Sequence, residues 1–199
     1  MPAFLLVVTE GLLEIPVAKK VLTTLGIDQD QTRFYPKGGK DAFWRDAQKY
    51  NRAALHVGPI LGIADLEQQP CVPGLIEKYI PRSREQNFVL RVAERMLESW
   101  LLADREALAR YLYVPVGRVP ADPDSLPNPK LELVNLARQS RRRRIFEDLV
   151  PKQGGQGVVG RGYTPVMTAF IDDFWRPRVA AGHSSSLMRA LNAIERAVA

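Results

Sequence analysis

The first half of the chain alternates short apolar runs with longer stretches in which apolar residues recur at helical spacing. Buried or half-buried strands are predicted at 3–8, 33–35, 59–64 and 88–92. Helices are predicted at 15–25, 70–80 and 93–111, and after the N-cap candidate Asp41. Alternation of strands and helices is typical of βαβ units, so the sequence predicts an α/β fold with a mainly parallel sheet flanked by helices.

The pattern changes after Tyr111. Residues 115–129 hold five of the 15 prolines, which predicts an extended connector. Beyond it we expect short helices at 130–137 and 141–149, a glycine-rich loop at 154–162, and a last helix from Ser186 with N-cap oxygens from residues 184–186. These differences predict an α/β domain at residues 1–112, and a Pro-rich connector with a basic helical extension packed on it at residues 113–199.

The composition of the 199 residues, 46% hydrophobic and 25% charged, excludes a disordered chain, a collagen-like repeat and a disulfide scaffold. The single cysteine, Cys71, has no partner for an internal bridge, which favours a reducing compartment. The apolar opening lacks a basic leader and is too short to span a bilayer. We therefore expect a cytoplasmic protein that does not associate with membranes.

Charge is distributed unevenly along the chain. Residues 1–104 hold 13 basic and 13 acidic residues, whereas residues 105–199 hold 15 basic and 9 acidic ones and carry the whole net charge of +6. The second part contains the unbroken run Arg141, Arg142, Arg143 and Arg144. A positive electrostatic field confined to one part of the chain suits the binding of a polyanion such as nucleic acid. The alternative is a solvated helix face, because Arg143 and Glu147 have the i,i+4 spacing of a supporting ion pair.

Two glycine-rich segments resemble phosphate-binding loops without meeting the requirements. Gly38-Gly39-Lys40 lacks the first glycine of a P-loop and is followed by Asp41, where Ser or Thr would hold magnesium. Residues 155–160 satisfy G-x-G-x-x-G, yet no strand is predicted before them. The second segment is therefore predicted to be a mobile loop.

Acidic residues follow two of the predicted strands. Gly11 permits a sharp turn between Glu10 and Glu14, so Glu10 projects from the sheet edge and Glu14 begins the next helix. Asp65 and Glu67 end the third strand and are expected to point the same way. The carboxyl ends of parallel strands meet at one edge, and clustered carboxylates suit Mg²⁺ or Mn²⁺ bound with a phosphate. Alternatively, the first pair only caps a helix N-terminus.

A strand that ends in Glu-Gly-x-x-Glu, followed by a helix and later by a strand with an acidic end, resembles the TOPRIM domain. That domain serves topoisomerases, primases and nucleases of the overcoming-lysogenization-defect type. The chain is also similar to small bacterial TOPRIM-related proteins whose family is termed a domain of unknown function. This similarity is carried by four segments: Asp65-Leu66-Glu67 with Cys71, the stretch 91–104 with Glu98-Ser99-Trp100 and Asp104, Asn128-Pro129-Lys130, and the terminal 184–187.

The resemblance implies a metal-dependent phosphoryl-transfer site. Glu10 would be the general acid/base or a metal ligand, Asp65 and Glu67 would be magnesium ligands, and Glu14 would match the second glutamate of the nuclease version. The usual Asp-x-Asp is Asp-Leu-Glu here, which moves one carboxylate by about a bond length, enough to matter to a catalytic geometry.

Two further acidic residues lie in the stretch 91–104. Glu98 is expected either near the metal or in an ion pair with Arg91 or Arg95, and of these we favour the site. Asp104 is expected to be structural.

The leading prediction is a TOPRIM-like, Mg²⁺-dependent nuclease or phosphotransferase that acts on nucleic-acid phosphodiesters. Lys130 and Arg141–Arg144 are the predicted phosphate contacts. The resemblance also implies a role in bacterial defence or mobile-element control with a separately encoded ATPase, since the sequence has no ATP-binding motif. The alternative is a non-catalytic TOPRIM-shaped module that binds nucleic acid or protein. The sequence leaves open whether the chain forms an oligomer.

Overall fold

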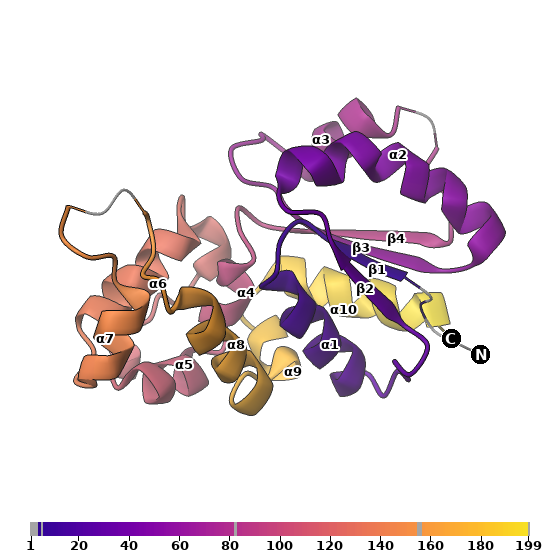
Figure 1. The fold of residues 1–199 in the computed structure, drawn as a ribbon. Coiled ribbons are helices and arrows are strands. Elements are labelled where there is room, and N and C mark those ends of the chain that lie inside the picture. Colours follow the sequence, from indigo (N-terminus) through magenta and orange to yellow (C-terminus); the bar gives the residue numbers. More distant parts are fainter. Residues whose placement is uncertain (1–3, 5, 82, 155–156, 199) are drawn as a thin grey trace.

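The computed structural model of the protein describes Phe4 and residues 6–81, 83–154 and 157–198. Four strands form one sheet in the order β2-β1-β3-β4, and every neighbouring pair is parallel (Figure 1). The strands are β1 (Leu6–Thr9), β2 (Arg33–Pro36), β3 (Ile60–Asp65) and β4 (Phe88–Ala93). The predicted α/β class and parallel sheet are confirmed.

Helices cover both faces of the sheet. Helices α2 (Lys40–Val57) and α3 (Val72–Tyr79) lie on one face, and α1 (Glu14–Thr24) and α10 (Ser185–Val198) lie on the other (Figure 1). The strands alternate their side chains between these layers. Val8 and Ile60 pack in the core under α2, whereas Val7 and Leu61 pack in the core on the opposite face.

The remaining helices are α4 (Glu98–Leu102), α5 (Arg105–Leu112), α6 (Pro129–Arg138), α7 (Arg143–Leu149), α8 (Tyr163–Asp173) and α9 (Pro177–Ala181). They form a separate group, and three of them, α4, α6 and α8, reach the carboxyl ends of the strands (Figure 1). Two 3-10 turns, η1 (Val116–Arg118) and η2 (Pro123–Ser125), lie in the Pro-rich stretch. One hydrophobic cluster joins Val17 and Leu61 to Leu133 and Phe170 of the second half. The division at residue 112 stays a prediction.

The predicted single helix over 93–111 is wrong. Arg95 has a φ of +59°, and the chain turns before α4 begins at Glu98. A second break falls at Asp104, whose carboxylate accepts a hydrogen bond from the backbone N–H of Ala107, with 3.4 Å between N and Oδ1, and so caps α5. The break at Asp104 could not be seen in the sequence, because apolar residues recur at helical spacing through both α4 and α5.

Smaller differences concern helix ends. Asp41 lies inside the first turn of α2, and its predicted capping position is taken by Gly39, at a φ of +135°. The capping role of Ser184 is confirmed, since its Oγ accepts from the N–H of Leu187 at 3.1 Å. Helices α8 and α9 were not predicted; Pro165 sits in the first turn of α8, where proline is tolerated.

Parts of two predicted segments, the start of the first strand and residues 155–156 of the glycine-rich loop, lie outside the described residues. In the part of the chain that the structure covers, no helix combines the length and the apolar character needed to cross a membrane.

Candidate functional site

Glu10 and Asp65 lie next to each other where β1 and β3 end. The two strands are neighbours in register, and the backbone N–H of Asp65 donates to Glu10 Oε1 at 3.3 Å. The same oxygen accepts from Trp44 Nε1 at 3.1 Å. Asp65 Oδ1 in turn accepts from the backbone N–H of Leu97, with 2.8 Å between the atoms. Each carboxylate is thus fixed by groups from other elements of the fold.

Glu14 and Glu98 join these two residues from the starts of α1 and α4. Glu14 Oε2 accepts from the N–H of Gly11 at 3.2 Å, as a helix-capping carboxylate would. Glu98 is buried, its Oε1 accepts from the hydroxyl of Tyr163 at 2.8 Å, and Lys130 Nζ lies 3.4 Å from the same oxygen. The structure therefore brings together four carboxylates and one ammonium group.

A cavity of about 320 Å³ opens beside this cluster. Its polar wall consists of Glu14, Asp65, Glu98, Lys130 and Tyr163. This volume lies at the lower end of the range that is typical of small-ligand sites. Its position, at the carboxyl edge of a parallel sheet, is where α/β proteins place their ligands.

The cluster carries more negative charge than its surroundings compensate. Burial, together with the nearby carboxylates of Glu14 and Glu67, raises the pKa of Glu10 to about 7. Burial and the nearby carboxylates of Glu98, Glu10 and Glu14 raise the pKa of Asp65 well above its ordinary value. Burial also raises the pKa of Glu14, as does Glu98. Such shifts are typical of sites that take up a proton or a cation.

Lys130 and Tyr163 partly offset this charge. Burial acts to lower the pKa of Lys130, but the carboxylates of Glu98, Asp65 and Glu14 outweigh it and raise the pKa. Burial and the adjacent Glu98 raise the pKa of Tyr163 well above its usual range, so its hydroxyl remains a hydrogen-bond donor. One ammonium group therefore faces several carboxylates.

The donor set can be compared with what a hard divalent cation requires. The oxygen atoms that the cluster offers to a cation all belong to carboxylates, the ligand type that Mg²⁺ and Mn²⁺ prefer. Glu10 Oε2, Asp65 Oδ2 and Glu98 Oε2 accept no hydrogen bond from the residues that the structure describes. Within those residues, no group of three or more His, Cys, Asp or Glu side chains is placed so that it could hold a metal ion as it stands. The cluster fits such a cation by ligand type and charge, and its side chains would have to move closer together to bind one.

Glu67 does not join the others as expected. Strand β3 ends at Asp65, and Glu67 has a φ of +50°, so the alternation of a strand no longer sets its direction. Its carboxylate forms an ion pair with Lys40 on α2. The expectation that Glu67 ends the third strand together with Asp65 is therefore wrong, and Glu67 still lies close enough to Glu10 to raise the pKa of that residue.

The arginine run lies outside this cavity, around the start of α7, and all four of its residues are exposed. Arg142 stacks on the ring of Tyr113 at 3.7 Å. Arg143 pairs with Glu147 at 2.7 Å, and Arg144 lies 3.7 Å from an oxygen of Asp148. The i,i+4 pairing of the alternative interpretation is present, and the arginines are at the same time accessible to a polyanion.

Two residues of the site were not identified from the sequence, and the roles of Glu98 and Asp104 were left to be decided between a site role and a structural one. Trp44 and Tyr163 were missed; the only signal for Tyr163 would have been the helix that it begins. Glu98 pairs with Lys130 rather than with an arginine of β4 or its following loop. Asp104 is structural as expected: its carboxylate is fully buried and accepts two side-chain hydrogen bonds from Arg176, at 2.6 and 3.0 Å.

The fold and the site define an α/β protein with an acidic cluster at the carboxyl edge of its parallel sheet. Comparison of the chain with protein-family models, curated proteins and solved structures finds no match. The resemblance to the TOPRIM domain therefore stays a prediction from the sequence motifs.

Proposed function

We propose that the protein is a TOPRIM-like, Mg²⁺-dependent nuclease or phosphotransferase that acts on nucleic-acid phosphodiesters. The observation that carries the proposal is the convergence of Glu10, Glu14, Asp65 and Glu98 beside one lysine at the carboxyl edge of the sheet. Four carboxylates from four separate elements are expensive to gather in a partly buried place unless a cation neutralises them.

Asp65, Glu14 and Glu98 line the cavity and would hold the metal, with Glu10 beside them. When bound, a divalent ion would polarise a phosphodiester oxygen. Glu10, whose pKa is about 7, accepts the proton of the attacking water or hydroxyl as the new O–P bond forms, and the departing oxygen takes a proton from solvent as its bond to phosphorus breaks. Tyr163 holds Glu98 in place by its hydrogen bond.

The substrate assignment is supported by charge. Lys130 reaches the cavity wall, where it is able to contact a phosphate oxygen, and Arg141–Arg144 present exposed guanidinium groups outside it. Arg142 and Tyr113 form a stacked cationic and aromatic pair of the type that contacts single-stranded nucleic acid. A cytoplasmic role in defence or mobile-element control with a separate ATPase belongs to the same proposal and rests on the resemblance alone.

The experiment that tests the proposal is cleavage of plasmid, single-stranded DNA and RNA in Mg²⁺, Mn²⁺ or EDTA. Glu10→Gln and Asp65→Asn are compared with Glu77→Gln, an exposed glutamate on α3 that serves as the matched control. We expect metal-dependent cleavage that both site variants reduce at least about 100-fold and the control leaves unchanged. Cleavage that persists in EDTA or in both site variants contradicts the assignment.

The non-catalytic module is retained as a second candidate because of Glu67 and Lys130. The carboxylate of Glu67 is held by Lys40, and Lys130 already neutralises part of the cluster. If the protein is such a module, the cleavage assay shows no cleavage in any metal, and the protein binds nucleic acid in a salt-sensitive way.

A further inference from the structure

A second cavity, of about 570 Å³, lies along the outer side of β4. Its walls come from three elements: the start of α3 with Cys71, the strand itself with Arg91, and α10 with Arg189. Strand β4 is at the edge of the sheet, so within the described chain its outer backbone has no partner strand. The proposed catalytic role uses none of these residues.

Arginine side chains gather around this cavity. The Nε of Arg91 and the Nη1 of Arg84 both donate to the carbonyl oxygen of Leu90, at 2.5 and 3.5 Å, which brings two guanidinium groups to one atom. Burial, together with repulsion from Arg84, Arg196 and Arg189, lowers the pKa of Arg91 to about 10. Arg91 remains charged at neutral pH, so the neighbouring guanidinium groups repel one another in the folded protein.

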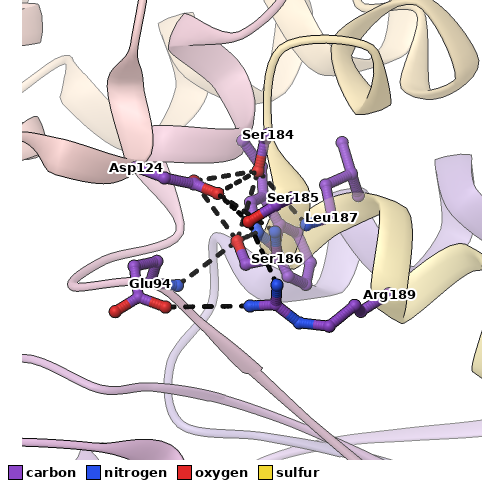
Figure 2. Close-up of polar contacts among 8 residues, drawn as sticks. Glu94, Asp124, Ser184, Ser185, Ser186, Leu187 and Arg189 are labelled. Atoms are coloured by element: carbon purple, nitrogen blue, oxygen red, sulfur yellow. Dashed lines mark hydrogen bonds and ion pairs between the residues drawn. The ribbon is translucent and has the colours of Figure 1, made fainter.

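Acidic groups compensate this charge only in part. Glu94 also lines the cavity, and its Oε2 lies 3.8 Å from Arg189 Nη2 (Figure 2). Among the residues that the structure places, Arg84, Arg91 and Arg196 form no ion pair within 4.0 Å. In the cavity lining one glutamate therefore faces two arginines, Arg91 and Arg189, while Arg84 and Arg196 add positive charge close to Arg91. A concave surface with this imbalance attracts anions.

The wall formed by α10 is firmly positioned. Asp124 accepts hydrogen bonds from Ser184 Oγ at 2.9 Å and from the backbone N–H of Ser186 at 3.0 Å, at the N-terminus of α10 (Figure 2). The Oγ of Ser186 accepts from Trp100 Nε1 at 2.7 Å and from the backbone N–H of Glu94 at 3.4 Å. The helix that carries Arg189 is thus tied to the end of β4, and the cavity exists before any ligand enters.

We propose that this cavity binds the phosphate group of a small phosphorylated molecule. Guanidinium groups present paired N–H donors that match phosphate oxygens, and several of them suit a group of more than one negative charge. The cavity has the volume of a typical small-ligand site. This inference is independent of the proposed nuclease activity, because it involves other residues on another side of the sheet.

Cys71 provides a direct readout. It is exposed, it lines the cavity and it is the chain's single cysteine, so alkylation by iodoacetamide reports on this site alone. The rate is measured on the full chain with pyrophosphate as the probe, against chloride at equal ionic strength. EDTA is present throughout, which keeps metal-bound pyrophosphate out of the carboxylate cluster. We expect pyrophosphate to slow alkylation in a saturable way, and chloride to leave the rate unchanged.

Three variants assign the effect to the arginines. Arg91→Gln and the exposed Arg189→Gln are each expected to weaken the pyrophosphate protection about tenfold, as the loss of a charge-assisted hydrogen bond does. Arg45→Gln, on the exposed side of α2, is the matched control and keeps the protection. Arg189→Gln keeps the test valid if the half-buried Arg91 is needed for folding.

A second arm uses a short single-stranded oligonucleotide. Protection by pyrophosphate, with or without protection by the oligonucleotide, supports the proposal. Equal alkylation rates in pyrophosphate and chloride overturn the proposal, and so does protection by the oligonucleotide alone. Protection by pyrophosphate that survives in both Arg91→Gln and Arg189→Gln overturns it as well.

Discussion

Lys130 faces Glu98 across the candidate site, with 3.4 Å between Nζ and Oε1. Glu98 is buried, and Lys130 is also close enough to Asp65 and Glu14 for their carboxylates to raise its pKa. This ammonium group is therefore the main internal compensation for the acidic cluster, and the balance between them determines how the protein responds to mutation, pH and metal.

Replacement of Lys130 by Met should destabilise the metal-free protein at pH 8. Removal of one partner leaves the buried Glu98 and its neighbours uncompensated, at a cost of about 2 kcal/mol in the free energy of unfolding after allowance for the partial exposure of Lys130. Urea denaturation in EDTA measures this loss. Lys130→Arg is the control and should retain most of the stability. Mg²⁺ should restore stability to the Met variant, and an unchanged midpoint in EDTA would contradict the compensation.

The stability of the metal-free protein should increase as the pH is lowered from 8 to 5. The pKa of Glu10 is about 7 in the fold against an ordinary value of 4.5, so above pH 7 the folded state bears a buried charge that the unfolded chain solvates. Protonation as the pH falls through 7 removes this penalty, and the gain is complete below 4.5, at about 3 kcal/mol. Asp65 and Glu14 act in the same direction.

Unfolding free energies from urea titrations at a series of pH values test this dependence. Glu10→Gln should be more stable than the wild type at pH 8 and should show a smaller gain on acidification. A stability that falls over this range, or the same slope in both proteins, would rule out Glu10 as its source.

Asp104→Asn should weaken the fold without changing the candidate site. Asp104 caps α5 and holds Arg176 with its buried carboxylate, and loss of a buried charge partner costs about 3 kcal/mol. Thermal or urea unfolding measures the change. Metal binding to the carboxylate cluster, followed by titration calorimetry below the unfolding temperature, should be unaffected; a large loss of metal affinity would give Asp104 a role that its contacts do not suggest.

The double substitution Arg143→Gln and Arg144→Gln should reduce the salt dependence of nucleic-acid binding. Two fewer phosphate contacts lower the slope of log K against log salt by about 2 on duplex DNA. Fluorescence anisotropy at several chloride concentrations gives the slope. The stability cost should be small, because both arginines are exposed and their ion pairs are on the surface. An unchanged slope would show that these arginines do not contact phosphates.

The sheet could be predicted because its two longest strands have a strong local signal. Residues 60–64 form a continuous apolar run that ends at Asp65, and the strand from Phe88 is apolar except for Arg91. The breaks at Arg95 and Asp104 could not be predicted, since they depend on a left-handed turn and on a side-chain cap within a stretch that remains periodic.

The candidate site was predictable only as far as topology determines it. Parallel pairing of β1 with β3 brings Glu10 to Asp65, and that follows from the order of strands and helices. The direction of Glu67 depends on the residue at which β3 ends, and the contact of Tyr163 with Glu98 depends on how a helix of the second half packs. Such tertiary contacts leave no periodic trace in the sequence.

The hydrophobic cluster that joins Leu61 of the sheet to Phe170 of α8 has a consequence for dissection of the protein. Fragments cut within the Pro-rich stretch and produced separately would each expose a large apolar surface, and are expected to aggregate when alone. Mixed during refolding, they have the complementary surfaces needed to reassemble, which would make this chain a natural scaffold for a split reporter.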